Sequence, residues 1–100
     1  MPIVSTTRPQ WLDEALEFIT LEMTALDQNH PDPLVGDYRV DARPFESDPT
    51  AGFYVYVQKL NGTDRWVDVS RVSETVMKHD STSKLADTAA ALYDSAQEGR

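Results

Sequence analysis

Residues 53–62 read Phe-Tyr-Val-Tyr-Val-Gln-Lys-Leu-Asn-Gly (FYVYVQKLNG), and this stretch decides the fold class. Aromatic and β-branched residues fill its first five positions, which is typical of a β-strand. Asn61-Gly62 is the pattern of a type I′ hairpin turn, although Thr63-Asp64 would allow a longer loop. We therefore predict a strand over 53–60 and an antiparallel return over 65–70.

A strand is also predicted before this hairpin. In residues 38–43, Tyr38, Val40 and Ala42 alternate with charged residues, which indicates a strand with one face in water. Pro44 has no backbone N–H to donate, so it marks an edge position or the end of the strand. The three strands follow one another directly, which predicts an antiparallel meander.

Two helices flank the meander. The first is predicted to begin at Pro9 and to stop near 28–30, because Pro31 and Pro33 cannot continue it. A last helix follows the 80–83 break and ends at Gly99. The apolar stripe of the first helix is Leu12, Ala15, Leu16, Ile19, Met23 and Leu26, and that of the last is Leu85, Ala86, Ala89, Leu92, Tyr93 and Ala96.

Residues 72–79 fit two structures. Val72 and Val76 are four apart, as on one face of a helix, whereas Val67, Val69 and Arg71 alternate and would extend the third strand. We predict a short helix that begins near Ser70–Ser73.

The predicted architecture is a single α+β domain over residues 1–100, a two-layer sandwich with helices on one face of the sheet. The expected core is Leu16, Ile19, Met23, Val55, Val57, Leu85, Ala89 and Leu92. The element order resembles that of double-stranded RNA-binding domains. Ser83-Lys84 and Ala89-Ala90-Ala91 also resemble the start of the last helix in that family. RNA binding is not expected, because that family's paired lysines are reduced to Lys84 and the first helix is acidic.

The charge distribution points to the kind of partner. The formal net charge is −8, and seven carboxylates with no Lys or Arg lie between Pro9 and Asp37. Nucleic acid and anionic membrane would repel this protein, whereas a basic protein surface would attract it. Solubility alone is the alternative explanation. Glu22, at the margin of the first apolar stripe, is expected to be partly buried against Arg39, Arg43 or Arg71.

The residues that usually carry chemistry are sparse. The absence of Cys excludes disulfides, thiolate metal ligands and a Cys nucleophile, and the four glycines are too scattered for a phosphate loop. His30 and His79 each lie near a carboxylate, without the spacing of a metal motif. We expect no metal, no cofactor and no enzymatic activity; a loop-built enzyme site around the two histidines is the minor alternative. Without an apolar run of about 20 residues or a secretory signal, we expect a cytoplasmic protein.

One face of the predicted hairpin is suited to recognition. If Phe53, Val55 and Val57 face the helices, Tyr54 and Tyr56 lie on the open face. Trp66 joins them there, beside Arg39, Arg43 and Arg65; Tyr, Trp and Arg are the residues that dominate binding hot spots. The alternative is that these side chains form ordinary cross-strand pairs that stabilise a solvent-facing sheet. A homodimer through this face would be consistent with both interpretations.

These observations favour a small, acidic, non-enzymatic binding module. We expect an inhibitor or adaptor that docks on a basic, nucleic-acid-handling protein, with the acidic helix imitating phosphates or steering association. A phage or mobile-element origin is compatible with this. The alternatives are a structural homodimer and an immunity protein against a basic toxin. The predicted partner-binding residues are Asp13, Glu14, Glu17, Arg43, Tyr54, Tyr56 and Trp66.

Overall fold

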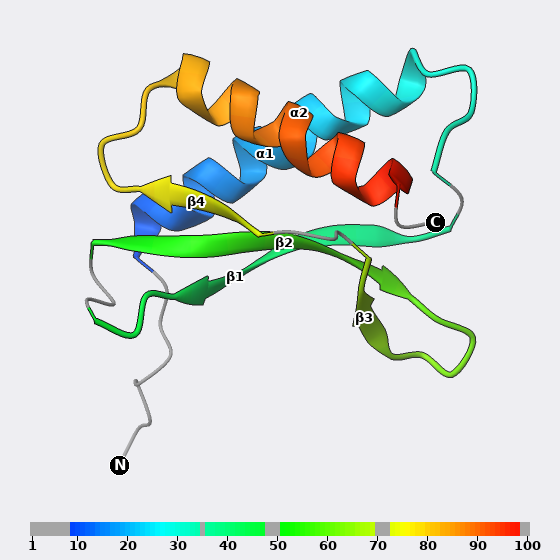
Figure 1. The fold of residues 1–100 in the computed structure, drawn as a ribbon, viewed down its shortest axis with the longest axis horizontal. Helices are drawn as coiled ribbons and strands as arrows, with labels where there is room; N and C mark the ends of the chain where they lie inside the picture. The colour runs from blue at the N-terminus through cyan, green and yellow to red at the C-terminus, as the bar shows by residue number, and fades with distance from the viewer. Residues whose placement is uncertain (1–8, 35, 48–50, 70–72, 99–100) are drawn as a thin grey trace.

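The computed structural model describes residues 9–34, 36–47, 51–69 and 73–98. Within them the elements are α1 (Gln10–Gln28), β1 (Tyr38–Pro44), β2 (Gly52–Leu60), β3 (Trp66–Asp68), β4 (Glu74–Met77) and α2 (Thr82–Glu98). Figure 1 shows both helices on the same side of an antiparallel sheet, and no described helix or strand covers the other face, which we call the open face. The predicted α+β two-layer fold is therefore confirmed.

The central strand of the sheet is β2. It pairs with β1 along nearly its whole length, with Val40 opposite Val57 and Ala42 opposite Val55. Its other edge is shared by β3 and β4: Asp68 lies opposite Gln58, and Glu74 lies opposite Val55. The path from Asp68 to Glu74 has three more residues than the matching stretch of β2. The third strand of the meander is therefore divided into two parts with different registers.

The short helix predicted within 72–79 is wrong, because this segment contains β4. Val76 lies opposite Phe53 and is fully buried, while Thr75 and Met77 on either side of it are exposed. That alternation is the strand pattern, and the i,i+4 spacing of Val72 and Val76 could not distinguish it from a helix. The start of the predicted helix, at 70–72, lies outside the described residues.

The hairpin turn takes the longer of the two forms considered. The Asn61 side chain accepts hydrogen bonds from the backbone N–H groups of Thr63 and Arg65, at 2.9 and 3.0 Å. The positive φ of this loop, 59°, is at Asp64. A two-residue Asn-Gly turn is thus replaced by a loop organised around one asparagine side chain.

The core lies between the helices and the sheet. All eight residues predicted for it are buried; with them the cluster comprises Leu12, Ala15, Leu16, Ile19, Met23, Phe53, Val55, Val57, Val76, Leu85, Ala89, Leu92, Tyr93 and Ala96. Leu26, which the spacing assigned to the same stripe, is 40% exposed. Spacing determines the phase of a stripe, but not how far along the helix the sheet continues to cover it.

The two helices run parallel, as the colours in Figure 1 show, so both begin at one end of the molecule. At their far ends the buried Tyr93 of α2 donates a 2.7 Å hydrogen bond to the Asp27 carboxylate of α1. The same carboxylate oxygen accepts from the backbone N–H of Leu34 at 2.8 Å. Gln97 donates to the Tyr93 hydroxyl and to the Asp32 carbonyl. These bonds attach the loop after α1 to the end of α2.

Candidate interaction surfaces

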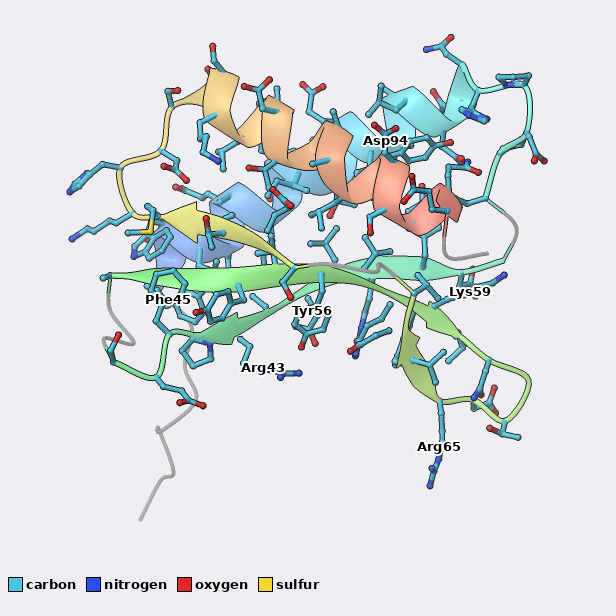
Figure 2. All side chains as sticks on the ribbon, viewed as in Figure 1. Arg43, Phe45, Tyr56, Lys59, Arg65 and Asp94 are labelled. Atoms are coloured by element: carbon cyan, nitrogen blue, oxygen red, sulfur yellow. The ribbon has the colours of Figure 1, made fainter. Side chains whose placement is uncertain are left out.

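The open face of the sheet carries the aromatic side chains predicted for it and two of the three predicted arginines, Arg39 and Arg43. The register places Arg43 opposite Tyr54, Asp41 opposite Tyr56, and Trp66 opposite Leu60. Figure 2 shows Arg43 and Tyr56 projecting from the side of the sheet away from the helices. Because alternate residues of a strand point to opposite faces, burying Phe53, Val55 and Val57 leaves Tyr54 and Tyr56 on this side.

Direct contacts hold these side chains in place. The Arg39 guanidinium carbon lies 4.3 Å from the ring centroid of Trp66, and that of Arg43 lies 5.4 Å from the ring centroid of Tyr56. Both distances are in the cation–π range. Trp66 and Tyr56 are half-buried, whereas Tyr54 is 43% exposed. The order already present in this face lowers the entropic cost of covering it with a partner.

A polar row crosses the three strands beside the rings. Arg39 donates two hydrogen bonds to the side-chain amide oxygen of Gln58, Oε1, at 3.1 and 2.9 Å. Gln58 donates in turn to Asp68 at 2.9 Å, and Arg39 forms a 3.7 Å ion pair with Asp41. This row fixes the amide orientation of Gln58 and the position of Arg39.

Phe45 also belongs to this surface, although it was not among the predicted residues. Its ring lies 4.7 Å from that of Tyr54, centroid to centroid. The signal was present, because Phe45 continues the alternation of residues 39, 41 and 43 one residue beyond β1, whereas the predicted strand ended at Pro44. Arg65, predicted near this patch, is exposed and extends away from the sheet in Figure 2.

The helical layer carries almost all of the net negative charge. Together α1 and α2 contain eight carboxylates and one base, Lys84, whereas the acids and bases of the four strands balance. Asp13, Glu14 and Glu17 are exposed, as predicted, and Asp87, Asp94 and Glu98 of α2 extend the acidic surface. Figure 2 places Asp94 on the opposite side of the sheet from Arg43.

The predicted pairing of Glu22 with Arg39 or Arg43 is wrong. Glu22 is half-buried on α1, while both arginines lie over rings on the far side of the sheet. The third predicted partner, Arg71, lies outside the described residues. Within the described part of the chain, no helix carboxylate takes part in an ion pair.

The predicted partner-binding residues therefore form two surfaces and not one. Arg43, Tyr54, Tyr56 and Trp66 gather on the open sheet face, which we call the aromatic face. Asp13, Glu14 and Glu17 lie on the helical layer, which we call the acidic face. The sheet separates them, so a single compact partner would contact one or the other.

A hollow of about 280 Å³ opens where the two helices begin. Its walls include Trp11 and Phe18 of α1 and Leu85 of α2, and its polar lining includes Glu14, Lys78 and Asp80. This hollow adjoins the acidic face, because Glu14 belongs to both. A smaller hollow of about 120 Å³ on the aromatic face is lined by Arg43, Tyr54, Tyr56, Asp68 and Ser73.

The two histidines are far apart. His30 packs its ring against Tyr93 near the end of α2, whereas His79 precedes the start of that helix. Seventeen residues of helix at about 1.5 Å each separate those ends by about 25 Å. They therefore share no site, and the described residues hold no cluster of three or more His, Asp and Glu side chains that could bind a metal ion.

Two tyrosines at the far end of the helices have altered acidity. Burial, and then the hydrogen bond to Asp27, raises the pKa of the Tyr93 phenol. Burial, and then the charge of Asp27, raises the pKa of Tyr38. Both shifts favour the neutral phenol. At neutral pH the hydrogen bonds around Asp27 and Tyr93 therefore stabilise the packing of the loop after α1 against the end of α2.

Comparison of the chain with known protein families, with curated proteins and with solved structures found no match. None of the described helices is both long and apolar enough to cross a membrane.

Proposed function

We propose that this protein is a small, non-enzymatic binding module that docks its acidic face on a basic protein surface. The observation that supports this is the separation of charge between the layers: eight carboxylates and one lysine in the helices, against balanced charge in the strands. Such a layer presents a one-signed field to a partner, which raises the association rate more than the final affinity.

The partner class follows from the same field. Proteins that handle nucleic acids carry basic surfaces that bind phosphates, and a layer of carboxylates on two parallel helices can imitate that spacing. The proposed role is therefore an inhibitor or adaptor of such a protein, acting in the cytoplasm and encoded by a phage or mobile element. An immunity protein that neutralises a basic toxin would use the same face.

The test compares two variants with equal net charge. In the acidic-face variant, Asp13→Asn, Glu14→Gln and Glu17→Gln remove three of the eight net negative charges, which leaves −5. In the control variant, Asp37→Asn, Glu46→Gln and Asp64→Asn do the same at exposed positions outside the helices. Proteins are captured from a cell lysate at about 50 mM and about 500 mM salt, because screening should release a charge-driven partner.

We expect a basic protein to be retained at low salt by the wild type and the control variant, and lost with the acidic-face variant. Association of the purified partner should then be slowed about tenfold or more by the acidic-face substitutions, with a smaller effect on dissociation. If the two variants lose the partner to the same extent, net charge, and not this face, attracts the partner. Capture that resists high salt would argue against the proposal.

The aromatic face supports a second candidate function, self-association. Its rings are held by Arg39 and Arg43, and its charges alternate in sign along β1 from Arg39 to Asp41 to Arg43. Two copies related by a two-fold axis could place arginines opposite aspartates, while their acidic faces stay on the outside.

A further inference from the structure

The hollow where the two helices begin is suited to one kind of side chain. Trp11 and Phe18 are half-buried and provide aromatic walls, and Trp11 is held in an edge-to-face contact with Phe53 at 5.8 Å. Leu85, which is 9% exposed, lies in the first turn of α2. The lining also includes two carboxylates, Glu14 and Asp80. An aromatic wall beside carboxylates is the environment that recognises a flat organic cation.

One carboxylate oxygen of Asp80 accepts a hydrogen bond from the backbone, and the other accepts none from the described residues. Its Oδ2 accepts a 2.8 Å hydrogen bond from the backbone N–H of Met77. Its Oδ1 has no partner among the described residues. Glu14 accepts only a long, exposed bond of 3.3 Å from Gln10 within the same set. Both carboxylates, which line the hollow, therefore retain acceptor capacity.

The balance of charge around the hollow is negative. Lys78 is the base in its lining, and the two helix N-termini each add about half a positive charge. Glu14 and Asp80 offset these. Of the described charged residues within three positions of the helical lining residues, Asp13, Glu17 and Asp87 are negative and Lys84 is positive. The sum is about two negative charges, which favours a cation and disfavours a phosphate or carboxylate ligand.

We propose that this hollow receives an arginine side chain of the basic protein on which the acidic face docks; the source of that arginine rests on the proposed function. The planar guanidinium can stack on the Trp11 ring and donate to both carboxylates, whereas a lysine ammonium is more strongly hydrated and has no flat face. Lys78 is then the internal competitor for the same two carboxylates.

The experiment uses small probes and the full chain. N-acetyl-arginine amide is titrated into labelled protein while the two tryptophan indole N–H signals are followed by NMR, with Trp66→Phe used to assign them. The neutral isostere N-acetyl-citrulline amide and the lysine analogue are titrated in parallel. We expect a saturable shift of the Trp11 signal with the arginine probe, a weaker one with lysine and none with citrulline.

Three variants test the residues. Glu14→Gln should weaken arginine binding about three- to tenfold, whereas Asp13→Asn, which removes the same charge outside the hollow, should change it less than twofold. Lys78→Ala should strengthen binding. Equal losses in Glu14→Gln and Asp13→Asn, an equal response to citrulline, or a shift confined to the Trp66 signal would each overturn the proposal.

The outcomes also separate this inference from the proposed function. If the arginine probe binds but the lysate yields no salt-sensitive basic partner, the hollow stands and the docking function fails. If a basic partner depends on the acidic face but the probe does not bind, the docking stands and the arginine pocket is wrong.

Discussion

Thr88 is buried in α2 with 1% of its surface exposed, and its hydroxyl has no hydrogen-bond partner among the residues that the structure describes. The threonines of α1 behave differently: Thr20 and Thr24 donate to backbone carbonyls four residues earlier, at 2.8 and 2.9 Å. An unpaired buried hydroxyl costs about 1–3 kcal/mol.

Replacing that hydroxyl with a methyl group should stabilise the protein. Thr88→Val keeps the shape and the β-branch, so the free energy of unfolding should rise by about 1 kcal/mol. Thr88→Ser, which keeps the hydroxyl and loses the methyl group, should lower it. Chemical denaturation followed by circular dichroism measures both. A destabilised Thr88→Val variant would show that the hydroxyl is satisfied.

The Tyr93 phenol should make stability depend on pH in the alkaline range. Burial and the bond to Asp27 raise its pKa, so the folded state holds this proton more tightly than the unfolded state. The resulting stability is complete below the ordinary tyrosine pKa of about 10 and is lost as pH rises through the folded-state value.

Tyr93→Phe removes both the hydrogen bond and this titration. We expect it to cost about 1–2 kcal/mol at pH 7, and we expect the difference from the wild type to shrink as pH rises above about 10. Denaturation midpoints measured across this range decide the matter. Parallel pH profiles would mean that Tyr93 titrates alike in the folded and unfolded states.

At the level of elements, α1 shows how one stripe of side chains docks a helix on a sheet. Leu16 is 7% exposed and faces the core, while Leu21 of the same helix is 64% exposed. The two leucines have the same chemistry and the same helix propensity, so they form a matched pair. Leu16→Ala should cost about 2–5 kcal/mol, and Leu21→Ala less than about 0.5 kcal/mol. Similar losses of unfolding free energy would mean that the helix phase is wrong.

The outer edge of β1 is protected against unwanted strand pairing. The Phe45 N–H bonds to Gly52, so odd-numbered residues of this strand point their N–H groups toward β2 and even-numbered ones point outward. The outward N–H of Ala42 donates to the Asp41 carboxylate at 2.8 Å, and Pro44 has none. Two of the outward positions are thereby closed to another chain, which leaves the faces, and not this edge, for binding.

Considered as a whole, the molecule is polarised between its two layers, with an acidic helical layer on one side and an electrically balanced sheet on the other. The two candidate functions use opposite sides of this arrangement. Docking by the acidic face should depend more strongly on salt than self-association, because exposed charge is screened whereas the ring contacts of the aromatic face are not.

Self-association through the aromatic face can be tested directly. Tyr54→Ala with Trp66→Ala should reduce a dimer to a monomer while leaving the helical circular dichroism signal unchanged, since both rings lie outside the core cluster. Light scattering gives the molar mass, and the acidic-face variant serves as the control that should leave it unaltered. An unfolded double variant would assign these rings to folding and not to binding.

The positions and phases of the long elements follow from the sequence because they depend on local periodicity. The stripe of α1 and the alternation along β2 each repeat several times, so the buried faces and the open position of Tyr54 and Tyr56 were predictable. The identity of residues 74–77 was not, because four residues hold too few repeats to separate a strand from a helix; burial of Val76 opposite Phe53 decides it.

Relations between elements needed the tertiary structure. Only packing shows that α1 and α2 run parallel, which brings Trp11 and Glu14 to Asp80 and Leu85 across some seventy residues of chain. Packing also places the acids of α2 beside those of α1 and separates all of them from Arg39 and Arg43. Local periodicity determines which face of each helix or strand is buried. Which element packs against that face depends on contacts between residues distant in sequence, and those contacts create the two surfaces and the hollow.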